Sequence, residues 1–245
     1  MIDFYSWWTP NGWKIGIMLE ECGLEYAAHG VNIGKGEQFK EEFLKISPNN
    51  RIPAIIDQDG PGGKPLSLFE SGAILQYLGR KTGKFYSADE RKRAKTDEWL
   101  MWQMANFGPM LGQTHHFLLY APTIEKREGA LDYGQNRYRT EARRLYGVLD
   151  DQLSDYEFVA GDDLSIADFA IYPWAIPHKL QDIDFAEFPN VNRWFETLRA
   201  RPKVQAGYEA LKAERDAAKV DAEESAKNLF GQKQKERHHH VKEEQ

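Results

Sequence analysis

The chain has 245 residues, 41% of them hydrophobic, and is long enough for one large domain or two modest domains with hydrophobic cores. Its net charge is -6 and its basic residues form no stripe with interleaved aromatic residues, which argues against nucleic acid and an acidic membrane surface as partners. No apolar run approaches the roughly 18 residues of a membrane-spanning helix and no signal peptide precedes the first strand, so we expect a soluble, cytoplasmic protein.

The first predicted elements are a strand over residues 1–5 and a helix that begins just after Thr9. Thr9 suits the N-cap position, and Pro10 suits the first helical position, where an N–H would have no helical partner. The N–H groups of Asn11 and Gly12 would then point out of the helix start, which lowers the pKa of a nearby thiol from about 8.5 toward neutrality. Since no cysteine lies there, the turn is either an ordinary capped helix or the place where the thiol of a bound ligand is activated.

The single cysteine, Cys22, lies late in this helix, between Glu21 and Gly23. One cysteine excludes an intrachain disulfide, a Cys-x-x-Cys redox pair and a cysteine zinc site. A free cysteine on an apolar helix face is more often a small packed residue than a nucleophile, so we expect a structural role. We also expect no metal site, because the adjacent His115 and His116 lie on different helix faces.

The next elements predict a compact α/β domain of thioredoxin type over residues 1–84. A weakly alternating strand over residues 25–33 is followed by a flexible loop and a short helix over residues 40–46. Two apolar runs, residues 54–56 and 66–68, flank a Gly/Pro-rich loop and predict an antiparallel hairpin. A parallel β-α-β unit with an antiparallel edge is therefore expected.

The two ends of this hairpin predict a site for a small zwitterionic peptide. Pro53 has no N–H for a sheet ladder and belongs at the start of its strand, which leaves the backbone of Ile52 free to pair with an extended peptide. A helix is expected to begin near Ser71, where free N–H groups favour a carboxylate, and Glu70 could hold an ammonium. Taken alone, the pair Glu70-Ser71 is more typical of a plain helix cap, and it indicates a binding site only together with Ile52-Pro53.

A short polar segment over residues 82–87 marks the boundary to a second domain over residues 89–210. Apolar residues at helical spacing over residues 89–119 and 127–153, without convincing strand pairs, predict a helical bundle.

A capping box formed by Ser165 and Asp168 predicts a buried helix that runs through Tyr172 and ends near Pro173 or Pro177.

A charged extension is expected over residues 211–245. After Pro202 the composition is rich in Ala, Glu, Lys and Arg and predicts a helix to about Leu229-Phe230. The histidines His238 to His240 are more typical of a solvated tail than of a metal site.

Two segments of the first domain carry a resemblance to a known family. They are Ile46-Ser47-Pro48-Asn49-Asn50-Arg51-Ile52-Pro53-Ala54-Ile55 and Phe69-Glu70-Ser71-Gly72-Ala73-Ile74. These segments look like the glutathione site of the glutathione transferase superfamily, and most like that of its nu-class disulfide-bond oxidoreductases. The resemblance covers roughly residues 1–210 and implies a thioredoxin-like domain followed by a helical bundle, glutathione as co-substrate and a homodimer.

The resemblance also implies how the tripeptide is held. The bond before Pro53 would be cis, the backbone of Ile52 would pair with the cysteinyl part of glutathione, and Glu70 with Ser71 would bind the γ-glutamyl end.

Further residues receive roles from the resemblance alone. Thr9 and Asn11 would hydrogen-bond the glutathione sulfur and act as catalytic residues, and Gln38 and Arg51 would complete the glutathione-binding set. Arg137 would contact a second glutathione. Considered without the resemblance, Gln38 is a solvated loop residue and Arg137 is one exposed arginine among several.

Aromatic residues are the candidates for the acceptor pocket beside the glutathione sulfur. Trp7, Trp8, Trp102 and Phe107 fit either that pocket or the core. The resemblance places the aromatic run from Tyr172 to Trp174 in the core of the second domain.

The expected function is reduction of a small-molecule disulfide by the thiolate of bound glutathione, with no protein cysteine involved. Two alternatives stay open: conjugation of glutathione to a small electrophile by the same thiolate, and a glutathione-binding regulator without catalysis.

Overall fold

A four-stranded mixed sheet forms the base of the first domain in the computed structural model, which describes residues 1–219 and 222–231. The strands are β1 (Ile2–Ser6), β2 (Tyr26–Gly30), β3 (Ala54–Asp57) and β4 (Leu66–Phe69). Their order is β2-β1-β3-β4, with β2 parallel to β1 and with β3 and β4 antiparallel to their neighbours. The predicted hairpin and the parallel β-α-β unit are confirmed.

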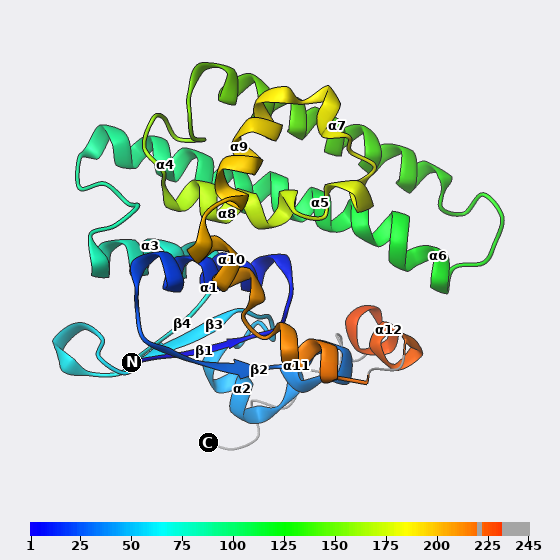
Figure 1. Cartoon of the computed structure of the whole chain (residues 1–245). Coiled ribbons are helices and arrows are strands. Elements are labelled where there is room, and N and C mark those ends of the chain that lie inside the picture. Colours follow the sequence, from blue (N-terminus) through cyan, green and yellow to red (C-terminus); the bar gives the residue numbers. More distant parts are fainter. Residues whose placement is uncertain (220–221, 232–245) are drawn as a thin grey trace.

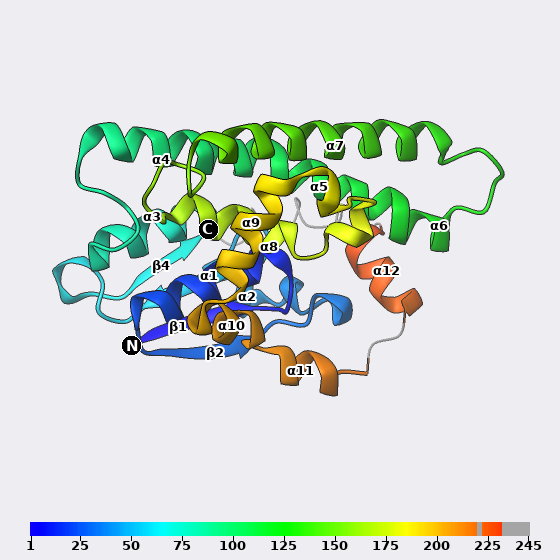
Figure 2. The same ribbon diagram turned by 45° about the horizontal axis from the view of Figure 1, so that its top comes forward.

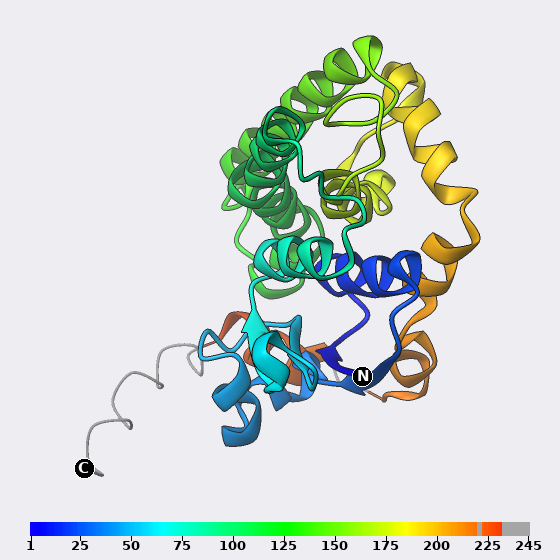
Figure 3. The same ribbon diagram turned by 90° about the vertical axis from the view of Figure 1, so that its left-hand side faces the viewer.

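Helices cover both faces of this sheet. On one face, α1 (Pro10–Cys22) and α3 (Ser71–Thr82) lie side by side between the sheet and the helical part of the chain (Figure 3). On the other face, Phe43 of α2 (Glu41–Ile46) packs in a small cluster with Val31 and Ala54. This layered arrangement is the thioredoxin-like domain that the sequence predicts.

The second part of the chain is all helical (Figure 1). Its α-helices are α4 (Glu90–Trp102), α5 (Gly108–His115), α6 (Ala121–Ile124), α7 (Asp132–Asp155), α8 (Ile166–Ala175), α9 (Pro189–Arg199) and α10 (Pro202–Glu209). Two π-helical turns, Gln103–Phe107 and His116–Tyr120, join α4 to α5 and α5 to α6. The long α7 runs beside α5 (Figure 2). The fold class is as predicted.

Short 3-10 helices occupy several connections: Ile33–Lys35, Glu37–Phe39, Pro61–Gly63, His178–Gln181 and Phe185–Glu187. No helix in the described part of the chain is long and apolar enough to cross a bilayer.

One hydrophobic core runs through both parts of the chain and includes Phe4 of the sheet and Trp194 of α9. At the contact between α1 and α10, a Cβ on Gly207 would lie 2.4 Å from the Cα of Ile17. Only glycine permits this approach, so the crossing depends on a residue without a side chain. The two domains therefore form one packed unit.

The capping box at the start of α8 is confirmed. Asp168 is fully buried and accepts hydrogen bonds, each of 2.9 Å, from the N–H groups of Val159 and Ser165, the Ser165 hydroxyl and the Trp194 indole. The helix ends at Ala175, within the range expected.

The expected single helix after Pro202 is wrong: the chain forms α10, α11 (Lys212–Ala217) and α12 (Ala222–Phe230). The first break is at Leu211, which adopts a left-handed φ of 62° and buries its side chain to 5% exposure. Burial of this apolar side chain overrides the helix propensity of its neighbours. Residues 238–240 lie outside the described part of the chain.

We predict that Asp168→Ala lowers the free energy of unfolding by about 3 kcal/mol or more, because it leaves four buried donors without an acceptor. Urea denaturation monitored by circular dichroism measures the change. The control is Asp163→Ala, which removes an exposed ion pair with Lys92 and should change stability by no more than about 0.5 kcal/mol. Equal effects of the two variants would contradict the structural role of Asp168.

Candidate functional site

The turn from β1 into α1 has the geometry that the sequence predicts. Thr9 is the N-cap, with extended backbone angles, and Pro10 is the first helical residue. The Thr9 hydroxyl does not cap the helix, and its contact with the Trp7 carbonyl is long, at 3.5 Å. Gly12 is required here, since a Cβ would lie 2.4 Å from both Ser6 Oγ and Trp7 O. The Thr9 hydroxyl is therefore available for other contacts.

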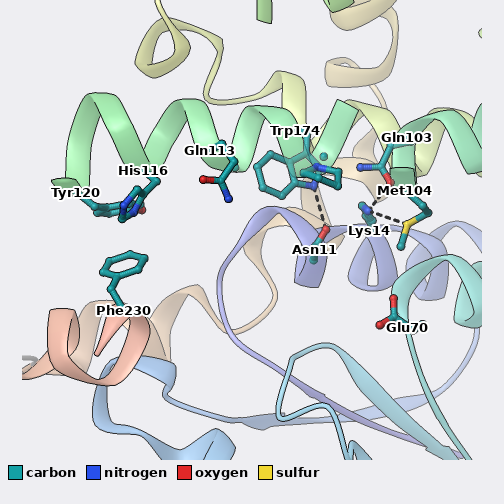
Figure 4. A pocket seen from close by; sticks show the side chains of 13 residues that line it. Asn11, Lys14, Glu70, Gln103, Met104, Gln113, His116, Tyr120, Trp174 and Phe230 are labelled. Carbon is teal, nitrogen blue, oxygen red and sulfur yellow. Dashed lines mark hydrogen bonds between the residues drawn. The ribbon is translucent and has the colours of Figure 1, made fainter. Parts of the chain in front are cut away.

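The side chain of Asn11 is oriented by a residue from the other domain. Trp174 of α8 donates its indole Nε1–H to Asn11 Oδ1 at 2.9 Å (Figure 4). An indole N–H can only donate, so the bound Asn11 atom is the carbonyl oxygen. The amide N–H₂ of Asn11 therefore remains as a donor, and no acceptor for it is present among the described residues.

Four of the predicted binding residues meet in one small cavity. The Ile52-Pro53 bond is cis, and Ile52 lies before Ala54, the first paired residue of β3. Glu70 precedes α3 with a left-handed φ of 71°, a conformation that is uncommon for a side-chain-bearing residue and often occurs at functional sites. The lining residues of this cavity of about 140 Å³ are Asn11, Arg51, Ile52, Pro53, Phe69, Glu70, Ser71 and Met104.

Gln38 lies in a second cavity, of about 360 Å³, which it shares with Thr9, Asn11, Arg51 and Ile52. Gln38 is 2% exposed, so the alternative of a solvated loop residue is wrong. Its Oε1 has no hydrogen-bond partner within the described ranges. Buried polar atoms are nearly always paired, so the unpaired Oε1 distinguishes Gln38 from other buried polar residues.

His115 contributes a second unpaired polar atom to the wall of this cavity. Its Nε2 is buried without a partner in the part of the chain that the structure describes. Burial lowers the pKa of His115 to about 4, so the ring is neutral at pH 7.

A third and larger cavity, of about 670 Å³, opens next to Asn11 (Figure 4). Its aromatic walls are His116, Tyr120, Trp174 and Phe230. None of the four aromatic residues expected at the acceptor pocket lines it. Instead, Trp8 packs against Trp13 and Tyr208, Trp102 stacks on the buried Phe107, and Trp7 lies beside Gly30.

Trp174 packs against the core, as expected of this aromatic run, but it is only partly buried and also lines the cavity. Its neighbour Tyr172 is buried as expected.

Lys14 is a site residue that sequence reasoning missed. It lies one turn after Asn11 on α1, is 1% exposed, and donates to Gln103 Oε1 at 2.7 Å and to Ser71 Oγ at 3.2 Å. Burial lowers the pKa of Lys14 to about 7, and the negative charge of Glu70 opposes this shift. A lysine between Trp13 and Ile15 in an otherwise apolar stretch is the signal that could have indicated it.

Arg137 does not join these residues. It lies on α7 with an exposed side chain and is not among the residues that line the three cavities. Its contact with a second ligand stays a prediction.

Cys22 lies at the end of α1 opposite to Thr9 and is 6% exposed. Burial raises the pKa of its thiol, which opposes formation of the nucleophilic thiolate. Within the described residues, no group of three His, Cys, Asp or Glu side chains could hold a metal ion.

Comparisons with known proteins find matches to both parts of the chain. Residues 2–80 match the family model of the glutathione S-transferase N-terminal domain, and residues 113–202 match that of the C-terminal domain. The disulfide-bond oxidoreductase YfcG of Escherichia coli is 49% identical over 215 residues, which are 87% of this chain and 96% of that protein.

Two solved structures of similar proteins contain glutathione. A glutathione transferase from Burkholderia graminis, with two glutathione molecules bound per subunit, is 42% identical with a TM-score of 0.80 and coverage of 86% and 88% of the two chains. A glutathione transferase from Pseudomonas putida, with one glutathione disulfide per subunit, is 43% identical with a TM-score of 0.78 and coverage of 85% and 90%.

We predict that Lys14 makes stability depend on pH. Because burial lowers its pKa from 10.5 to about 7, the unfolded chain binds more protons at this site between these values. The stability that Lys14 contributes therefore rises with pH across this window, by at most about 1.4 kcal/mol per pH unit. In urea denaturation from pH 7 to pH 9, the wild-type protein should gain stability relative to Lys14→Met.

The control for this prediction is Lys95→Met, which replaces an exposed lysine paired with Glu98. The difference in unfolding free energy between Lys95→Met and the wild type should be constant with pH. If the difference in unfolding free energy between the wild type and Lys14→Met were also constant with pH, Lys14 would have the same pKa in the folded and unfolded states.

Proposed function

We propose that this chain, which belongs to the glutathione S-transferase family, is an enzyme that reduces disulfide bonds with the thiolate of bound glutathione. One observation carries the proposal: Asn11 at the start of α1 lines one cavity with Ile52 and Glu70 and a second with Thr9 and Ile52, while Cys22 lies at the far end of the helix. The thiol must therefore arrive with the tripeptide.

The cavity walls supply a partner for each part of glutathione. The N–H groups at the start of α3, together with Ser71 and the ammonium of Lys14 behind it, would bind the γ-glutamyl carboxylate, and Glu70 would bind the ammonium. The backbone of Ile52 would pair with the cysteinyl part. Gln38 and Arg51 line the adjoining space and would contact the rest of the tripeptide.

Sulfur activation would come from three groups at the start of α1. The free N–H groups and the positive end of the helix dipole stabilise a thiolate. The Asn11 N–H₂, fixed by Trp174, and the Thr9 hydroxyl would donate hydrogen bonds to the sulfur. The thiolate attacks one sulfur of the substrate disulfide, forms a mixed disulfide with it and expels the other sulfur as a thiolate.

A second glutathione would complete the reaction. Its thiolate attacks the glutathione sulfur of the mixed disulfide, so that oxidised glutathione forms and the second substrate thiol leaves. The Burkholderia graminis relative with two glutathione molecules per subunit supports this stoichiometry. The cavity of about 670 Å³ next to Asn11 offers the space. The contact of Arg137 with the second molecule rests on the family resemblance alone, since this residue lies outside the cavity wall.

We further assign the chain to the nu class, to the cytoplasm and to a homodimer. The identity with YfcG supports the class. A single cysteine fits a reducing compartment. Exposed apolar side chains at Phe69 and Met101 are available to an interface.

The function is tested by comparing two substrates at equal glutathione concentration. We expect turnover of hydroxyethyl disulfide to exceed turnover of chlorodinitrobenzene, and the Cys22→Ala variant to retain the disulfide activity, because no protein thiol takes part. Dominant conjugation would favour the transferase alternative. Binding of glutathione with neither activity would favour a regulator.

We predict that Asn11→Ala lowers kcat for the disulfide about a hundredfold and that Trp174→Phe lowers it about tenfold, because the first removes a donor to the sulfur and the second only its orientation. The pKa of the bound glutathione thiol, read from the thiolate absorbance, should rise in both variants. Unchanged thiol pKa values in both variants would refute the assignment of Asn11 as the sulfur donor.

A further inference from the structure

Helix α12 is anchored on the first domain although it lies late in the sequence. It packs against the 3-10 helix Ile33–Lys35, at the edge of the molecule below α6 (Figure 1). Asn228 is 1% exposed and donates its Nδ2–H to the Gly34 carbonyl at 2.7 Å. A buried side-chain hydrogen bond of this kind fixes both the position and the rotation of a short helix.

The last residue of α12 reaches the helical domain. The Phe230 ring lies 4.8 Å from the His116 ring and 5.3 Å from the Tyr120 ring, measured between centroids. Both partners belong to the π-helical turn after α5, and Figure 4 shows the Phe230 ring directly facing their rings. The first domain holds α12 through Asn228, and the second domain contacts its last residue, Phe230. The helix therefore spans the space between the two domains.

Helix α12 forms part of the wall of the proposed active site. Phe230 lines both the cavity of about 670 Å³ and that of about 360 Å³, and Leu229 lines the latter. Both cavities also contain Asn11, whose amide would bind the glutathione sulfur. A disulfide bound in either of these two cavities would therefore lie near Phe230.

The wall lies outside the part of the chain that defines the family. The C-terminal family model ends at residue 202, and α12 begins at Ala222. The tripeptide-binding residues lie within the matched segments, so α12 adds to a site that is otherwise shared.

We propose that α12 forms the outer wall of the acceptor compartment and that Phe230 restricts the substrate to small-molecule disulfides. The proposal rests on the disulfide reductase function proposed above. A compartment of about 670 Å³ has the size of a small-molecule site. Phe230 lies on the wall of both larger cavities, and its ring contacts with His116 and Tyr120 oppose the displacement that the backbone of a folded protein substrate would require.

The test measures a selectivity ratio in the full-length protein. The ratio is kcat/KM for the disulfides of insulin divided by kcat/KM for hydroxyethyl disulfide, both with glutathione as reductant. Phe230→Ala should raise this ratio at least about tenfold by widening the entrance, and Phe230→Trp should lower it. Asn228→Ala, which releases the anchor of α12, should also raise it.

The control is Tyr156→Ala, at the C-terminal end of α7. Tyr156 is 44% exposed and Phe230 is 41% exposed, so the two truncations remove similar apolar surface, and Tyr156 lines none of the three cavities. The ratio should be unchanged in Tyr156→Ala.

An unchanged ratio in Phe230→Ala and Phe230→Trp, with melting temperatures equal to that of the wild type, would overturn the role of α12 and leave the reductase function standing. Absence of hydroxyethyl disulfide turnover by the wild type would instead refute the reductase function. Hydrogen exchange gives a second readout. Bound oxidised glutathione should slow exchange of the backbone amides of residues 222–230, and unchanged exchange rates would refute the proposal that α12 forms a wall of the acceptor compartment.

Discussion

The hydrogen bond between Trp174 and Asn11 is the interaction on which the proposed chemistry depends. It joins α8 of the helical domain to α1 of the thioredoxin-like domain at 2.9 Å and fixes which end of the Asn11 amide is free to donate. An amide that could rotate would offer the carbonyl and the N–H₂ in turn, and the carbonyl would repel a thiolate. The domain contact therefore determines which atoms of the site donate hydrogen bonds, as well as the shape of the site.

A second contact between the domains lies behind the peptide-binding residues. Lys14 of α1 bonds Ser71 at the start of α3 and Gln103 at the end of α4, so one buried ammonium connects three elements. Burial of this charge is unfavourable without a nearby anion, and Glu70 supplies only part of the compensation. A carboxylate ligand at Ser71 would stabilise the charged form. The buried ammonium of Lys14 therefore favours an anionic ligand at Ser71, and glutathione carries a suitable carboxylate.

The cavities belong to both domains and to the C-terminal extension. Ile52, Glu70 and Ser71 come from the first domain, Tyr120 and Trp174 from the second, and Phe230 from α12. The side proposed to bind the tripeptide is built from segments within the family match, whereas the opposite side includes a helix beyond it. Such an arrangement lets a shared glutathione site serve different acceptors through changes in one wall.

The sequence alone determined the features that depend on neighbouring residues. Thr9-Pro10 specifies a helix start, Pro53 immediately precedes a strand, and Ser165 with Asp168 forms a capping box, because each follows from local backbone sterics and short-range hydrogen bonds.

Only the tertiary structure decided the rest of the site. Asn11 and Trp174 lie 163 residues apart, and Gln38 and Lys14 became site residues through burial by distant segments. The turn at Leu211 that directs the chain toward α12 follows from packing, against the local helix propensity. These features arise from packing between residues far apart in the sequence. A local pattern can draw attention to a residue, as the lysine in an apolar stretch does at Lys14, but it does not specify the partner.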